Sequence, residues 1–168
     1  MTDAATVRQS ASSIRLREQL KKIISRRSYC TLASATPDGK PHAVGIMYKF
    51  VDGAFYFATG IDTKKAKNVQ RNPNVAICIP VRKYPVGPPF SIQFTGTAAS
   101  LSREDPEIVA LLKAGKLKSI TGFGVLNEPD LCFIKVKPAP KIHTYGIGVP
   151  LRELLKAPAH ADRTVVFD

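Results

Sequence analysis

The sequence has no long apolar run, few cysteines and few acidic residues, and each shortage excludes a class of protein. The longest apolar runs, such as Ala54–Ala58, fall far short of the roughly 20 residues that cross a bilayer, which excludes an integral membrane protein. Residues 1–13 contain no apolar stretch of the kind found in secretory signals, so we expect a cytoplasmic protein. Cys30, Cys78 and Cys132 are odd in number and widely spaced, which indicates neither a disulfide framework nor a metal site.

The shortage of acidic residues leaves a strongly basic chain. Thirteen Asp and Glu face 25 Lys and Arg, which gives a net charge of +12 and a pI near 9.9. This charge favours an anionic partner, such as a nucleic acid, a membrane surface or a phosphorylated small molecule. The excess is concentrated in two segments. Residues 1–30 contain seven basic and two acidic residues, and residues 60–83 contain six basic residues and one acidic residue. The 168 residues, 44% of them hydrophobic, suffice for one domain with its own core.

The residue patterns predict a mainly β, α+β domain. Helical spacing of apolar residues begins at Leu16, and the predicted flexible tail covers residues 1–13. Tight-turn signals between strands indicate antiparallel pairing and a six-stranded closed or split barrel with flanking helices. We expect the barrel domain over residues 14–146 and a C-terminal extension over residues 147–168. The predicted strands are 29–35, 42–51, 54–59, 75–81, 90–100 and 131–137, and the predicted helices after the first are 63–71, 102–117 (capped by Ser102) and 151–156.

The segment 57–68 (FATGIDTKKAKN) is the most informative part of the chain. An apolar strand ends there, a turn with Gly60 follows, and a helix begins beside hydroxyl and ammonium groups. Free amides at a helix N-terminus, threonine hydroxyls and lysine charge together form a phosphate site. The alternative is an ordinary helix start with solvated lysines, and the glycine pattern of a Walker loop is absent.

Five segments resemble the pyridoxamine 5′-phosphate oxidase-like family of flavin-binding split barrels. They read, in chain order, YCTLASATPDGKPHAVGIMY (29–48), FVDGAFYFATG (50–60), DTKKAKNVQRNPNVAI (62–77), IQFTGTAAS (92–100) and LCFIKVKPAPKIHTYG (131–146). Their order and spacing carry the resemblance, which covers most of residues 14–146. The resemblance implies an obligate homodimer with the cofactor in a groove between the subunits.

The resemblance also implies which residues bind the cofactor. The lysine three residues before the asparagine of the family's K-x-x-N pattern binds the cofactor phosphate, which here is Lys65, with Asn68 following. Neighbouring side chains would complete the anion pocket, and strand residues would lie along the flavin ring. The implied anion-pocket residues are Thr59, Thr63 and Lys64, and the implied ring contacts are His42 and Val44, with Ile46 nearby. Residues after Val81, such as Arg82, Lys83 and Tyr84, would reach the cofactor or substrate of the other subunit.

The chain departs from the vitamin-oxidising members of this family. Where their flavin-binding strand carries an arginine and a later lysine, residues 42–49 read HAVGIMYK, and the end of the chain shows no His-Arg pattern for pyridoxal phosphate. The resemblance therefore implies the branch that uses either FMN or the deazaflavin coenzyme F-420. A cofactor of either kind transfers hydride to or from a small-molecule substrate. Tyr48, Tyr84 and His42 are candidate proton donors.

Two other functions explain parts of the sequence. The first is a non-catalytic protein that binds a flavin, a deazaflavin or haem on the same barrel. The second is nucleic-acid binding, which ranks last because Phe50, Phe55 and Phe57 precede the lysines of 64–67 and do not alternate with them. The histidines are too scattered for a metal site. The proline-rich segment 82–89 is either a rigid connector or a lid.

Overall fold

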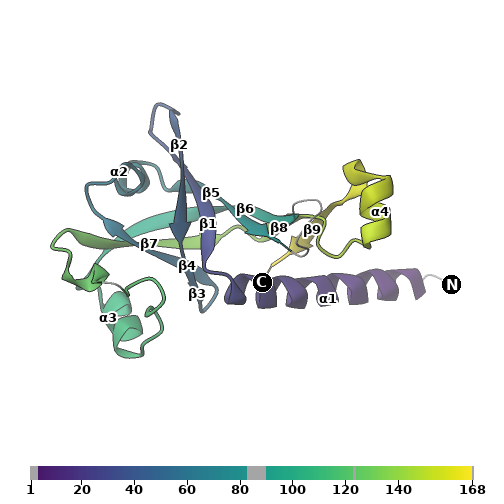
Figure 1. The fold of residues 1–168 in the computed structure, drawn as a ribbon, viewed down its shortest axis with the longest axis horizontal. Helices are drawn as coiled ribbons and strands as arrows, with labels where there is room; N and C mark the ends of the chain where they lie inside the picture. The colour runs from purple at the N-terminus through teal and green to yellow at the C-terminus, as the bar shows by residue number, and fades with distance from the viewer. Residues whose placement is uncertain (1–3, 83–89, 123, 168) are drawn as a thin grey trace.

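The computed structural model describes residues 4–82, 90–122 and 124–167, with side chains from residue 12 onward. The predicted mainly β, α+β fold is confirmed, but the described residues form nine strands where the sequence predicted six (Figure 1). The helices are α1 (Ala4–Arg26), α2 (Lys64–Arg71), α3 (Pro106–Lys113) and α4 (Leu151–Lys156), with short 3-10 turns η1 (Val125–Asn127) and η2 (Pro158–His160). The strands are β1 (Tyr29–Ala35), β2 (Pro41–Met47), β3 (Lys49–Val51), β4 (Ala54–Gly60), β5 (Asn74–Val81), β6 (Phe90–Ser102), β7 (Leu131–Pro138), β8 (Lys141–Tyr145) and β9 (Asp162–Val166).

All strands join one curled antiparallel sheet. Seven of them follow the order β2-β1-β5-β6-β7-β4-β3, and β8 and β9 extend the sheet from β6. The long strand β6 makes this possible, because its C-terminal half pairs with β7 and its N-terminal half pairs with β8 along the same edge. A Cβ at Gly96, where β6 leaves β7, would lie 2.6 Å from the carbonyl oxygen of Lys137. Glycine is therefore required where the two backbones approach each other.

The additional strands have two origins. The predicted strand 42–51 is divided at Tyr48, whose ring is fully buried and whose hydroxyl donates to the carbonyl oxygen of Ile24 at 2.9 Å. The ring lies 5.1 Å from that of Phe55, so the strand breaks to place an aromatic side chain in the core. Strands β8 and β9 were not among the predicted strands: β8 follows Pro138 and Pro140, and β9 lies in the predicted C-terminal extension. Val165 and Phe167, in and just after β9, are buried in the main core.

Helix boundaries differ from the prediction at the start of α1 and at both ends of α3, which ends at Lys113 rather than at residue 117. Helix α1 begins at Ala4, so the predicted tail is largely helical, and its residues Leu20 and Ile24 are fully buried. Helix α3 begins at Pro106 with Asp105 as its N-cap, because Ser102 still pairs with β7 at the end of β6. Helices α2 and α4 lie where the sequence predicted them. None of the helices in the described ranges is long and apolar enough to cross a membrane.

Strands β4 and β7 are buried on both faces, and they separate two apolar cores. Side chains alternate along a strand, so Phe55 and Phe57 face the main core while Tyr56 faces a second core beneath α3. Ile134 and Phe133 divide in the same way on β7. This double burial explains why β4 and the first part of β7 read as almost continuous apolar runs.

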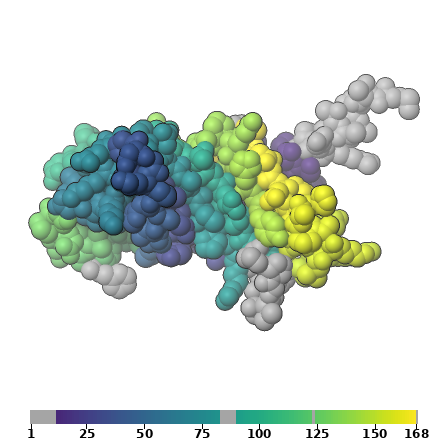
Figure 2. Space-filling view, turned by 90° about the horizontal axis from the view of Figure 1, so that it is seen from above, coloured from purple at the N-terminus to yellow at the C-terminus, as the bar shows by residue number. Residues whose placement is uncertain are grey.

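Strands β1, β5 and β6 are covered on one face only. The outward residues are small, and they line two adjoining hollows of about 750 and 850 Å³. In Figure 2 the dark blue residues of β1 and β2, the teal residues of β5 and β6 and the yellow-green residues near 140 adjoin on the side seen from above. The residues common to both hollows are Ala33, Ala76, Thr95, Ala139 and Pro140.

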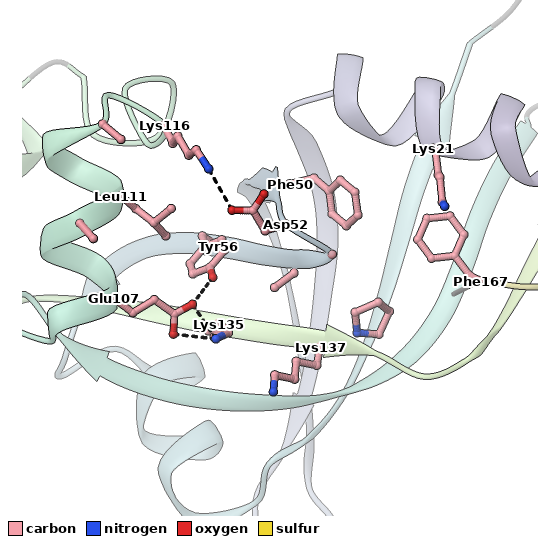
Figure 3. Close-up of a pocket in the computed structure, with 15 residues that line it drawn as sticks. Lys21, Phe50, Asp52, Tyr56, Glu107, Leu111, Lys116, Lys135, Lys137 and Phe167 are labelled. Carbon is pink, nitrogen blue, oxygen red and sulfur yellow. Dashed lines mark hydrogen bonds and ion pairs between the residues drawn. The ribbon is translucent and has the colours of Figure 1, made fainter.

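A polar cluster holds α3 against the sheet. Both carboxylate oxygens of Glu107 accept from the Lys135 ammonium at 2.6 Å, and Tyr56 donates its hydroxyl to the same carboxylate (Figure 3). These bonds lower the pKa of Glu107, the lysine bond most, because they favour the ionised form. Burial, followed by the bond to Glu107, raises the pKa of the Tyr56 phenol, which stays neutral.

We expect Glu107→Gln to lower the free energy of unfolding by about 1 kcal/mol at pH 7, the modest value of a partly exposed ion pair. Because the folded-state pKa of Glu107 is depressed, its contribution is present above the ordinary carboxyl pKa and is lost as the pH falls through the folded value. Urea unfolding should therefore show a difference in the free energy of unfolding between variant and wild type. This difference should be largest at pH 7 and should shrink below about pH 4. Glu104→Gln, at an exposed position nearby, is the control and should change little. A deficit at Glu107 that did not depend on pH would contradict this account.

Candidate functional site

The junction between β4 and α2 brings two predicted threonines together. The hydroxyl oxygens of Thr59 and Thr63 lie 3.3 Å apart. Thr63 is the N-cap of α2: its hydroxyl donates to the carbonyl oxygen of Gly60 at 2.8 Å and accepts from the amide of Ala66 at 3.4 Å. The amides of the first helical turn have no acceptor within the helix, so this end of α2 presents hydrogen-bond donors and a positive dipole.

The three lysines of α2 have different surroundings. Lys65 is half-buried, and burial lowers the pKa of its ammonium, since the charged form loses hydration. Within the described ranges Lys65 makes no ion pair, whereas Lys67 pairs with Asp62 at 2.9 Å. Lys64 is exposed. Lys65 is therefore the lysine for which an anion would offset a desolvation cost.

Asn68 faces inward rather than toward an anion. Its side chain is 7% exposed, and its amide nitrogen donates to the hydroxyl of Ser34 on β1 at 3.1 Å. This bond fixes α2 on the sheet and thereby sets the direction of the Thr63 and Lys65 side chains. The predicted cofactor contact at Asn68 remains a prediction, and the structure gives this residue a positioning role.

His42 and Val44 lie in one row on the edge strand β2. They pair with Ser34 and Leu32 of β1, and with Ile46 they form the half-buried face of the strand, while the alternate residues are exposed. Ser34 is also the residue that binds Asn68, so the row begins beside α2. The predicted ring contacts at His42 and Val44 remain predictions.

An acidic residue that the sequence analysis missed also lies at the turn. The amide of Ile61 donates to the carbonyl oxygen of Asp130 at 2.8 Å, and a Cβ at Gly60 would lie 2.5 Å from a carboxylate oxygen of Asp130. The carboxylate of Asp130 thus lies directly against Gly60, where a larger residue would have to displace this side chain. Asp130 follows Pro129 in a turn sequence far along the chain, and only the pairing of β4 with β7 brings it here.

The hollows on the open face of the sheet, beneath α3 and along α1 are not lined by Thr59, Thr63 or Lys65. The candidate site therefore lies apart from these four hollows.

The candidate proton donors are only partly available. Tyr48 is excluded because its buried hydroxyl is used by Ile24 and burial raises its pKa. His42 remains accessible, and residues 83–89, which include Lys83 and Tyr84, lie outside the described residues. Arg82 is exposed, and its carbonyl oxygen accepts from Arg27 at 3.2 Å. Within the described ranges no group of histidine, cysteine or acidic side chains could hold a metal ion.

Solved structures of similar fold have varied functions. The haem storage protein HutZ from Vibrio cholerae is 16% identical, with a TM-score of 0.65 over 79% of this chain and 96% of its own. General Stress Protein 26 from Bacillus anthracis is 26% identical, with a TM-score of 0.57 over 77% of this chain and 92% of its own. A structure named F-420 reductase is 21% identical, with a TM-score of 0.51 over 71% and 92% of the two chains.

Sequence comparison identifies the family. A pyridoxine/pyridoxamine 5′-phosphate oxidase from Acidothermus cellulolyticus is 29% identical over 76 residues, which are 45% of this chain and about a third (32%) of the relative. The family model for pyridoxamine 5′-phosphate oxidase matches residues 16–139, a range that includes β1 to β7, α2 and every residue of the candidate site. The chain therefore belongs to the pyridoxamine 5′-phosphate oxidase family of split barrels.

Proposed function

We propose that this protein is an oxidoreductase that binds FMN, or alternatively the deazaflavin coenzyme F-420, and transfers hydride between this cofactor and a small organic substrate. The observation that carries the proposal is Lys65: a half-buried ammonium beside the N-terminus of α2, with no carboxylate partner in the described part of the chain. An anion at this position would restore the electrostatic stabilisation that burial removes. Both cofactors carry a phosphate group.

The cofactor would lie along β2 with its phosphate at the end of β4. Thr59 offers its hydroxyl and Lys65 the charge, while the Thr63 hydroxyl, 3.3 Å from that of Thr59, would have to turn from the Gly60 carbonyl to donate to the phosphate. Lys64, being exposed, would contribute only screened attraction. Asn68 would act indirectly by holding α2 on β1, and His42 and Val44 would contact the ring.

The bound flavin or deazaflavin supplies the hydride chemistry. The protein's residues bind and orient it: the threonines and Lys65 fix the phosphate, and the apolar side chains of Val44 and Ile46 exclude water from one face of the ring. His42 stays a candidate proton donor because it is accessible, and since it lies in the row that would cover one face of the ring, it would reach a substrate at the edge of the ring.

We also propose that the protein works as a homodimer through the open face of β1, β5 and β6. Its outward side chains are small, so a second sheet could approach closely, and the two adjoining hollows are spaces that a partner's side chains could fill.

A haem-binding protein is the second candidate, because the haem storage protein HutZ shares this fold over 96% of its chain. Titration with haem, FMN and coenzyme F-420 separates the candidates. A Soret shift with haem but no response to either phosphate-bearing cofactor would overturn the oxidoreductase proposal. If a flavin or deazaflavin binds, a substrate-dependent change in its redox state distinguishes an enzyme from a carrier.

Lys65→Ala should weaken binding of the phosphate-bearing cofactor by roughly tenfold or more, since a charge-assisted hydrogen bond is lost. Quenching of cofactor fluorescence measures the affinity. Lys64→Ala, at the exposed neighbouring position of the same helix, is the matched control and should change affinity less than about threefold. Equal effects of the two substitutions would show that Lys65 has no special contact with the phosphate.

Ala76→Arg should convert the dimer to a monomer, because Ala76 lies at the centre of the open sheet face and is shared by both hollows. Sedimentation velocity would show the change in mass, and cofactor affinity should fall with it. Gln70→Arg, on the exposed side of α2, adds the same charge elsewhere and should leave the mass unchanged. A wild-type protein that sediments as a monomer would contradict the proposed assembly.

A further inference from the structure

A second concave surface lies on the opposite side of strands β4 and β7 from Thr59. It has a volume of about 1010 Å³. It lies between α3, the β3–β4 hairpin and the last turns of α1, which contribute Lys21 (Figure 3). Thr59 shares the strand face of Phe55 and Phe57, whereas Tyr56 of the same strand lines the hollow. The backbone of β4 therefore separates this hollow from the proposed cofactor site.

The lining of the hollow has an excess of positive charge. Four lysines and two carboxylates belong to it, and each carboxylate is neutralised by a lysine. Glu107 binds Lys135 at 2.6 Å, and Asp52 binds Lys116 at 2.9 Å. Two lysines thus remain in excess, Lys21 from α1 and Lys137 from β7.

The two excess lysines both line this hollow, and Lys137 also lines one of the two hollows on the open face of the sheet. Lys137 follows Lys135 on the same face of β7, and its charge contributes to the lowered pKa of Glu107, so it lies near the saturated carboxylate. Lys21 is half-buried, and its ammonium lies 5.7 Å from the centre of the Phe167 ring. Within the described ranges neither lysine has an ion-pair partner.

Apolar side chains occupy the space between the charges. Phe50 and Phe167 have ring centres 6.3 Å apart, and Leu111 and Pro138 complete the apolar lining. In Figure 3 Phe50 lies between Tyr56 and the Lys21–Phe167 pair in the view. The hollow therefore combines aromatic surface with two ammonium groups, and its volume is at the upper end of what small-molecule sites enclose.

We infer that this hollow is a binding site for an organic anion with an aromatic body, distinct from the proposed cofactor site. The ring would pack against Phe50 and Phe167, and the ammonium groups of Lys21 and Lys137, which border the hollow on different sides (Figure 3), would attract the anionic group. Glu107 cannot repel the ligand strongly, since its carboxylate is fully engaged by Lys135 and Tyr56. The same three residues fix α3, which forms one wall of the hollow.

The test compares two fluorescent probes with the same ring system. The anionic probe is 8-anilinonaphthalene-1-sulfonate and the neutral one is N-phenyl-1-naphthylamine. The double variant Lys21→Gln/Lys137→Gln should weaken binding of the anionic probe by roughly fivefold or more, the loss of two partly screened charges, and should change the neutral probe little. Both lysines have exposed or half-buried ammonium groups, so the variant should fold, which an unchanged thermal transition confirms.

Two single variants locate the bound probe. Lys113→Gln, on the exposed end of α3 outside the hollow, should leave both affinities unchanged. Lys65→Gln should also leave them unchanged, because Lys65 lies at the other site. The inference is overturned if the double variant binds the anionic probe as wild type does, if Lys113→Gln weakens it equally, or if Lys65→Gln alone weakens it. Equal losses for both probes would likewise exclude recognition of the anionic group.

Discussion

The pairing of β4 with β7 is the constraint on which the rest of the molecule depends. These strands are buried on both faces, so the ladder from Phe55–Val136 to Gly60–Leu131 joins the main core to the second core beneath α3. The register of this pairing also determines where the residues of the candidate site lie. It ends β4 at the turn where α2 begins, and it brings Asp130 against Gly60. A shift of one residue would exchange the two faces of β4 and remove both cores at once.

The two faces of β4 and β7 carry two kinds of positive charge. On one side Lys65 is half-buried at a helix N-terminus without a carboxylate partner in the described residues, which is the arrangement that favours a phosphate. On the other side Lys135 is engaged by Glu107, and the excess charge lies on neighbouring lysines at the rim of an aromatic hollow. Part of the net charge of +12 therefore lies at these two surfaces and part on α1. Nucleic-acid binding is not required to explain it.

Sequence patterns predicted the elements that local chemistry determines. The tight turn between the strands predicted over 42–51 and 54–59, the helix start near residue 63 and the apolar run of β4 follow from turn, cap and periodicity rules, and all three agree with the structure. Tertiary contacts determined the rest. Tyr48 interrupts a strand because the core accepts its ring, Asn68 turns inward because Ser34 lies beneath it, and Glu107 meets Lys135 only after α3 folds over β7. No local pattern contains those partners, since they are distant in sequence.

The account's central claim is that Thr59, Thr63 and Lys65 hold the phosphate of a flavin or deazaflavin, and comparison of FMN with riboflavin tests it most directly. The two molecules share the ring and differ in the phosphate, so fluorescence titration of the wild-type protein isolates the contribution of the anion. The account predicts that riboflavin binds roughly tenfold to a hundredfold more weakly than FMN, the loss expected for one or two charge-assisted hydrogen bonds. If F-420 is the cofactor that binds, its phosphate-free chromophore takes the place of riboflavin in the comparison. Equal affinities with and without the phosphate would contradict the claim.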